Sequence, residues 1–129
     1  MKTQIKVQDD CHHVELSGYI DFEAMRPLAL SIEQIYRQDS EARVVINLRG
    51  LHFVGSSGIS SFVKTLKTFN RARVKPSYFG LKSEFQRMFR LFEDKDVFDI
   101  CDNEEVARQT TRLRFADWKT KDAATDDLL

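Results

Sequence analysis

The chain has 129 residues, a length that fits one domain. Hydrophobic residues make up 42% and charged residues 31% of it, which is the balance of a globular protein and excludes a disordered chain or a coiled coil. The 20 basic and 20 acidic residues give no net charge, whereas proteins that bind bulk nucleic acid or anionic membranes usually carry a positive excess. No apolar stretch approaches the roughly 20 residues that span a bilayer, and the N-terminus lacks an apolar signal core, so we expect no membrane insertion. Two cysteines are too few for a disulfide scaffold and predict free thiols in a reducing, cytoplasmic setting.

The first third of the chain predicts a hairpin followed by a helix. Apolar residues alternate from Ile5 to Ile20 around a polar turn at Asp9-Asp10, and Gly18 ends or bends the second strand. Over residues 25–37 the apolar spacing changes to that of a helix, with Pro27 in the first turn, where a proline costs no hydrogen bond.

The middle of the chain predicts a buried strand and a second helix. Residues 43–48 contain a continuous apolar run, typical of a strand buried on both faces, and Arg49-Gly50 then predicts a turn. Helical spacing from Ile59 to Phe69 follows Gly55-Ser56-Ser57-Gly58, so the small and hydroxyl residues mark the start of an amphipathic helix.

The last third predicts two further strand and helix pairs. Tyr78-Phe79 is a short strand, Ser83 caps a Phe-rich helix, residues 97–101 form a last strand, and Asn103 caps a last helix.

The whole order is therefore β-β-α-β-α-β-α-β-α. It predicts an α/β fold with a mixed, mostly parallel sheet of about five strands and about four helices. We expect one domain over residues 1–113 and a flexible C-terminal tail over 114–129. The alternative is that Phe115 and Trp118 of this tail dock on the domain or on a partner.

Ser56 is the residue with the clearest chemical potential. The start of a helix leaves several backbone N–H groups without partners and carries about half a positive charge, so it suits an anion. A phosphate on Ser56 would add a charge of about −1.5 to −2 at pH 7, enough to turn off a partner that docks there. The alternative is a plain capped helix without modification.

The segment Val44-Val45-Ile46-Asn47-Leu48-Arg49-Gly50-Leu51-His52-Phe53-Val54-Gly55-Ser56-Ser57-Gly58-Ile59 resembles the signature of the STAS family, which includes bacterial anti-sigma-factor antagonists. Gly18-Tyr19-Ile20-Asp21 and residues 81–89 resemble two further steps of that family, and the similarity runs from about residue 3 to residue 113. The resemblance implies a regulatory switch and no enzyme. Its partner would be an anti-sigma factor that is also a serine kinase, of the histidine-kinase-like ATPase type.

The same resemblance places the phosphorylated serine at Ser56, with Ser57 as the less favoured target. The family commonly has an acid where this chain has Gly55, which leaves open a STAS module that is never phosphorylated and serves as a structural subunit of a transporter or signalling assembly. Asp21 either supplies the missing negative contact or simply caps a helix. The expected partner-binding surface consists of Asp21, Gly55, Ser56, Ser57, Gly58, Ser60, Ser61 and Lys64.

Other candidate sites are weaker. Cys11-His12-His13 lacks a second cluster at ligand spacing, and a strand directs His12 and His13 to opposite faces, so we predict no metal site. His52 lies in an apolar context and is expected to be packed or partly exposed rather than to act as a base. The basic residues between Lys64 and Lys75 are either a solvated face or an interface for an acidic partner. A small enzyme or nucleotide binder is a further alternative, but the chain has no P-loop or dinucleotide fingerprint, so we expect no cofactor.

Overall fold

The computed structural model describes residues 1–53, 55–92 and 98–127 of the chain. It confirms the α/β class and the predicted order of strands and helices. In chain order the elements are β1 (Lys2–Gln8), β2 (Cys11–Ile20), a 3₁₀ helix (Phe22–Ala24), α1 (Met25–Gln38), β3 (Arg43–Phe53), α2 (Gly55–Thr68), a second 3₁₀ helix (Phe69–Arg71), β4 (Ser77–Phe79), α3 (Ser83–Phe92), β5 (Asp99–Cys101) and α4 (Glu104–Asp127).

The five strands form one mixed sheet in the order β1-β2-β3-β4-β5. β1 and β2 are antiparallel, and the two-residue turn between them places Asp9 and Asp10 at φ values of 53° and 59°. These left-handed values at both positions are those of the hairpin turn that matches the twist of the flanking strands. The other three pairs are parallel, so the prediction of a mostly parallel sheet is confirmed.

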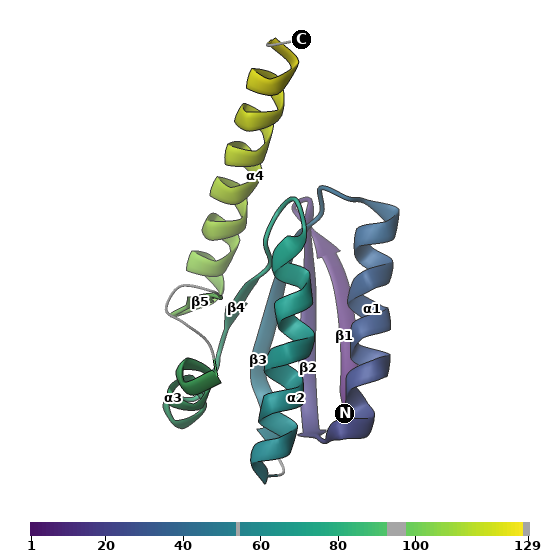
Figure 1. Ribbon diagram of the computed structural model, residues 1–129, viewed down its shortest axis with the longest axis vertical. Coiled ribbons are helices and arrows are strands. Elements are labelled where there is room, and N and C mark those ends of the chain that lie inside the picture. Colours follow the sequence, from purple (N-terminus) through teal and green to yellow (C-terminus); the bar gives the residue numbers. More distant parts are fainter. Residues whose placement is uncertain (54, 93–97, 128–129) are drawn as a thin grey trace.

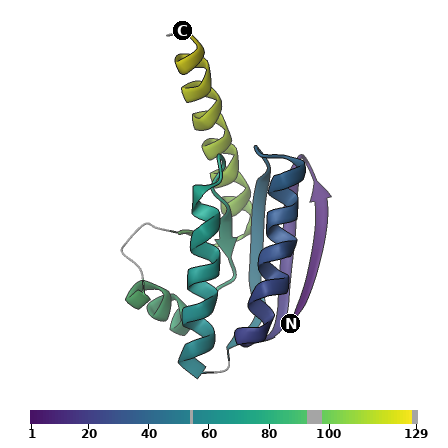
Figure 2. The same ribbon diagram turned by 45° about the vertical axis from the view of Figure 1, so that its right-hand side comes forward.

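Helices cover the two faces of the sheet unequally. α1 and α2 lie on one face, and α4 lies on the other and projects beyond the sheet (Figures 1 and 2). Most of the buried apolar residues belong to the cluster between the sheet, α1 and α2, while a smaller cluster beneath α4 contains Cys11, Val45, Phe79 and Ala107. Full burial of one large aliphatic or aromatic side chain stabilises the fold by about 1.5–3 kcal/mol, so the larger cluster supplies most of the apolar stabilisation.

The Phe-rich helix α3 packs at the end of this larger cluster. Phe89 is buried, and its ring meets the rings of Phe62 and Phe98 edge-on, with centroids 6.0 and 5.7 Å away. Phe85 is partly buried against the same cluster. The other residues of the predicted apolar stripe, Met88 and Phe92, have side chains outside the described part of the structure.

The turn predicted at Arg49-Gly50 is wrong, because both residues lie inside β3. The register between β2 and β3 shifts between Glu15 and Ser17, and Gly50 pairs with Ser17 beyond that shift. A Cβ on Gly50 would lie 2.8 Å from the Cβ of Ser17. The glycine therefore allows two strands to approach at an irregularity of the sheet, and it does not end the strand.

The segment for which we expected a flexible tail continues α4 to Asp127. The predicted cap is confirmed, since the Asn103 Oδ1 accepts a hydrogen bond of 2.9 Å from the backbone N–H of Val106. Further along, the Trp118 Nε1–H donates to a Glu41 carboxylate oxygen at 3.2 Å, and the Arg73 guanidinium lies 5.1 Å from the Trp118 ring centroid. The Lys119 Nζ lies 2.8 Å from Glu41 as well. These contacts with distant residues anchor the helix where the local sequence lacks apolar content.

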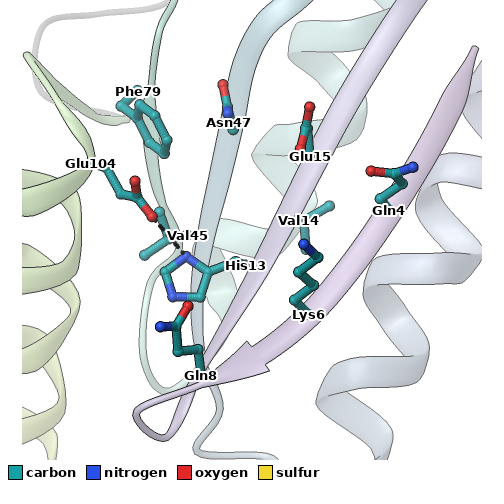
Figure 3. Close-up of a pocket in the computed structure, with 10 residues that line it drawn as sticks. All are labelled: Gln4, Lys6, Gln8, His13, Val14, Glu15, Val45, Asn47, Phe79 and Glu104. Carbon is teal, nitrogen blue, oxygen red and sulfur yellow. Dashed lines mark ion pairs between the residues drawn. The ribbon is translucent and has the colours of Figure 1, made fainter.

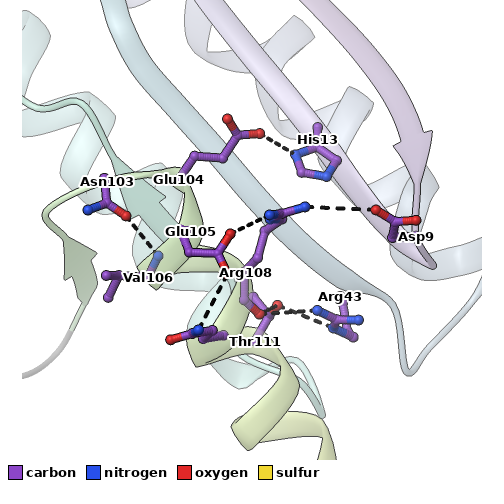
Figure 4. A network of polar contacts seen from close by, with 10 residues as sticks. Asp9, His13, Arg43, Asn103, Glu104, Glu105, Val106, Arg108 and Thr111 are labelled. Carbon is purple, nitrogen blue, oxygen red and sulfur yellow. Dashed lines mark hydrogen bonds and ion pairs between the residues drawn. The ribbon is translucent and has the colours of Figure 1, made fainter.

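A polar network fastens the first turns of α4 to the sheet (Figure 4). The Arg43 guanidinium donates to the Thr111 hydroxyl at 3.3 Å and to the Arg108 carbonyl at 3.1 Å. Arg108 in turn pairs with Glu105 and lies 3.8 Å from Asp9 in the hairpin turn. The network therefore fixes the angle at which α4 leaves the sheet. Across the described residues, no helix combines the length and the apolar character that crossing a bilayer requires.

Candidate functional site

The candidate site lies at the first turn of α2. This helix begins at Gly55, so Ser56 and Ser57 are its second and third residues. The prediction that Ser56 sits at a helix N-terminus is thus confirmed for the backbone, while the side chains of residues 55–57 lie outside what the structure describes. At this position the unpaired N–H groups of the first turn and the positive end of the helix dipole act together on any negative group nearby.

Gly58 brings this helix start against the end of β2. A Cβ on Gly58 would lie 2.9 Å from the carbonyl oxygen of Ile20 and 4.0 Å from the Cα of Asp21. The expectation that Asp21 comes near the serine segment is confirmed by this contact. Gly58 was expected on the partner-binding surface, but it is itself buried, and its close neighbour is the backbone of the same chain. It therefore shapes the surface from beneath.

Asp21 has a structural partner of its own. Its Oδ1 accepts a 3.0 Å hydrogen bond from the backbone N–H of Ala24 and so caps the 3₁₀ helix Phe22–Ala24. Of the two alternatives for this residue, the structure shows the helix cap. The carboxylate is exposed as well as bonded, and it adds negative charge close to the first turn of α2.

Two exposed aromatic side chains, one on each side of Ile20 and Asp21 in the sequence, were missed in the sequence analysis. Tyr19 is 66% exposed and Phe22 is 77% exposed, and the Tyr19 ring lies 5.5 Å from that of His52, its partner in the register between β2 and β3. His52 is exposed, and so it packs against Tyr19 at the surface. The alternation of the strand was a signal for the exposure of Tyr19. Neighbouring residues of a strand face opposite sides of the sheet, so Tyr19 faces away from the core that buries Ile20.

The outward residues of α2 behave as the helical pattern predicts. Ile59, Phe62 and Val63 are buried, while Lys64 is exposed. Ser60 and Ser61 are half-buried, and the Ser61 carbonyl accepts a 2.9 Å hydrogen bond from the Thr65 hydroxyl. Ser60, Ser61 and Lys64 thus form a polar strip along α2.

Cys11 and His13, two residues of the Cys11-His12-His13 segment, make structural contacts. Cys11 is buried beneath α4, and burial raises the pKa of its thiol above the ordinary value. The His13 Nδ1 lies 3.4 Å from a Glu104 carboxylate oxygen at the start of α4. His13 and Glu104 border a cleft of about 240 Å³ on the α4 side of the sheet (Figure 3). Among the described residues there is no group of three or more His, Cys, Asp or Glu that could hold a metal.

The basic stretch that follows Lys64 is partly used within the molecule. Arg73 lies over Trp118 and donates to the Ser40 hydroxyl at 3.3 Å, and the Lys75 Nζ lies 4.0 Å from Asp99. Part of this stretch therefore fixes α4 and β5 to the rest of the domain.

The STAS domain model matches residues 2–107, and the chain belongs to the STAS family. Its curated relatives include the "Anti-sigma-B factor antagonist" of Staphylococcus aureus (strain NCTC 8325 / PS 47), 24% identical over 106 residues that cover 82% of this chain and 97% of the relative. The protein of the same name from Staphylococcus epidermidis is 26% identical over 98 residues, covering 76% and 90% of the two chains. A solved anti-sigma-factor antagonist (STAS) domain protein from Planctomyces limnophilus shares the fold, with a TM-score of 0.65 at 12% identity over 84% of this chain and 96% of that one.

Proposed function

We propose that this chain is an anti-sigma-factor antagonist whose binding to its partner is switched off by phosphorylation of Ser56. The observation that carries the proposal is the position of Ser56 in the first turn of α2, in a chain whose family relatives are named anti-sigma-B factor antagonists. The partner is an anti-sigma factor that is also a serine kinase of the histidine-kinase-like ATPase type. The chain acts in the cytoplasm by binding this protein, without nucleic acid, cofactor or catalysis of its own.

The surface that receives the partner combines the helix start with its surroundings. It includes the predicted residues around Ser56, the strip of Ser60, Ser61 and Lys64, and the exposed rings of Tyr19 and Phe22. Large aromatic side chains commonly anchor protein interfaces, because they bury much area at little conformational cost. Gly58 seats the first turn of α2 against Ile20 and Asp21, the two residues that separate Tyr19 from Phe22 in the sequence.

Phosphorylation acts on the partner more than on the fold. A negative charge at an exposed helix N-terminus stabilises the helix by about 0.3–1 kcal/mol, so the domain stays folded. When a partner covers that position, the doubly charged group must lose its water or face like charges, which costs several kcal/mol, on the order of the energy that a moderate interface supplies. The nearby carboxylate of Asp21 adds to the repulsion of an acidic partner surface.

Gly55 supports a second candidate function. A STAS subunit that is never phosphorylated would have no need of the carboxylate that the family commonly places before the serine. In that case the same surface would hold the chain permanently in a transporter or signalling assembly.

Intact-mass analysis of the chain purified from its own cells separates these two functions. The switch predicts a species about 80 Da heavier, the mass of one phosphate group, that disappears in Ser56→Ala. Ser57→Ala is the matched control and should keep the heavier species. Absence of this species both when the partner is active and when it is inactive would favour the permanent subunit.

Partner binding supplies the second test. Ser56→Asp or Ser56→Glu should weaken binding to the partner by at least about tenfold, which corresponds to about 1.4 kcal/mol, with little change in thermal stability. Gly55→Asp should speed phosphate incorporation, because it restores the family's acid. An acidic Ser56 variant that binds as well as the native chain in a pull-down would overturn the switch.

A further inference from the structure

β1 forms one edge of the sheet and has β2 as its neighbour in the five-stranded order (Figure 1). All seven residues of β1 are extended, and six of them are exposed. An edge strand of this length presents a row of backbone N–H and C=O groups that a further strand can pair with.

The two faces of β1 differ in character. Gln4, Lys6 and Gln8 border the cleft on the α4 side of the sheet (Figure 3). Ile5 and Val7 alternate with them and therefore lie on the opposite face, with exposed fractions of 42% and 66%. The edge strand thus carries an exposed apolar face that the helices of this chain leave partly uncovered.

The hairpin determines which backbone groups point away from the sheet. The two-residue turn makes Gln8 and Cys11 its closing pair, and alternate residues of an antiparallel strand direct their backbone groups to the same neighbour. Residues 2, 4, 6 and 8 therefore bond to β2. Thr3, Ile5 and Val7 direct theirs outward, so the residues with outward backbone groups are also those on the apolar face.

Charge selects one register for the pairing of β1 with a second copy of itself. In an antiparallel pair centred on Ile5, Thr3 lies opposite Val7, Gln4 opposite Lys6 and Lys2 opposite Gln8. A pair centred on Lys6 would place two lysines opposite each other, and one centred on Gln4 would place Lys2 opposite Lys6, and like charges directly opposite destabilise a sheet. The register centred on Ile5 avoids both repulsions and uses all three residues with outward backbone groups.

We propose that two copies of this chain associate through their β1 edges, antiparallel and centred on Ile5, to form a continuous ten-stranded sheet with two-fold symmetry. The pairing joins Ile5 and Val7 of one copy with Val7 and Ile5 of the other into a single apolar strip. It requires neither the partner protein nor phosphorylation, so it stands apart from the function proposed above.

Disulfide trapping tests the register directly. Opposed residues of a hydrogen-bonded antiparallel pair have Cα atoms about 5.5 Å apart, within the range that a disulfide bridges. Ile5→Cys should therefore give a covalent dimer under mild oxidation with diamide, read on a non-reducing gel. Val7→Cys is the matched control, because its cysteine would face Thr3 and should give little dimer although this position is the more exposed. The native chain, with Cys11 and Cys101, gives the background of cross-linking.

Sedimentation over a range of protein concentrations tests the association without cross-linking. The native chain should show a reversible dimer, and Ile5→Lys should weaken it by about tenfold or more, because it sets two like charges on the symmetry axis. Leu30→Lys on the outer side of α1, at a position 51% exposed, makes the same exchange elsewhere and should leave the dimer unchanged. A native chain that stays monomeric at hundreds of micromolar would overturn the proposal, as would equal trapping of Ile5→Cys and Val7→Cys.

Discussion

Replacing Gly58 with alanine should destabilise this protein, although the same exchange stabilises most helices. Gly58 is the fourth residue of α2, and alanine in a helix interior is favoured over glycine by about 1 kcal/mol. In this chain, however, the added Cβ would lie 2.9 Å from the Ile20 carbonyl oxygen, closer than real Cβ atoms approach. The obstructing atom belongs to the backbone of a buried residue, so no side-chain rotation can relieve the contact.

The magnitude follows from these opposing effects. Overpacking a tight contact costs about 1–3 kcal/mol, and we expect a cost of about 2–3 kcal/mol here because its relief requires α2 to move away from β2. After the gain in helix propensity, we expect the free energy of unfolding to fall by about 1–2 kcal/mol. For a domain of this size that lowers Tm by roughly 4–8 °C.

Urea and thermal unfolding followed by circular dichroism measure this effect. Ser60→Ala, two residues further along the same helix at a half-buried position, is the control and should be neutral or slightly stabilising. If Gly58→Ala were as stable as the native chain or more stable, helix propensity would outweigh the contact with Ile20. The claim that this contact positions the first turn of α2 would then be wrong.

Three further predictions concern α4 and the thiols beneath it. Asn103→Ala should lower the free energy of unfolding by about 1 kcal/mol in a urea titration, because it removes the side-chain cap of α4. Asn103→Asp keeps an oxygen that can accept this hydrogen bond and should retain most of the stabilisation by the cap. Trp118→Ala should speed amide hydrogen exchange in residues 112–121 while leaving exchange in β3 unchanged, because it removes the contacts with Glu41 and Arg73, and equal protection in both chains would contradict this. Burial raises the pKa of the Cys11 thiol, so the unfolded chain loses this proton at lower pH than the folded one. The buried neutral thiol therefore stabilises the fold fully at pH values below its pKa in the unfolded chain, and this contribution declines as pH rises through its pKa in the folded chain. The urea midpoint should fall above about pH 9, and it should fall less in Cys11→Ala.

Local patterns predicted most of the fold because each element carries its own signal. The hairpin turn, the apolar face of α1 and the Asn103 cap depend on neighbouring residues, and all three are present in the structure. The two errors arise from contacts between distant residues. A side chain at position 50 would collide with Ser17 of the neighbouring strand, so only glycine fits there. α4 continues past Arg114 because Trp118 bonds to Glu41, 77 residues away in the sequence. A single glycine or a polar segment does not reveal such partners.

The candidate site was predicted in part for the same reason. The residues Gly55-Ser56-Ser57-Gly58 mark a helix start by their type, and parallel strands bring Asp21 to the same edge. The exposed rings of Tyr19 and Phe22 were missed because an aromatic residue in an apolar pattern is ordinarily read as core.

Because α4 follows all five strands in the sequence, the ribosome adds it after the rest of the sheet has been made. Arg43 reaches its partners Thr111 and Arg108 across 68 and 65 residues, so the second face of the sheet stays open while the ribosome adds the rest of the chain. Until α4 emerges, Val45 and Phe79 present a bare apolar surface to other nascent chains and to chaperones. A message truncated before residue 104 would therefore yield a product with its larger core assembled and its second face unprotected, a natural substrate for quality-control proteases.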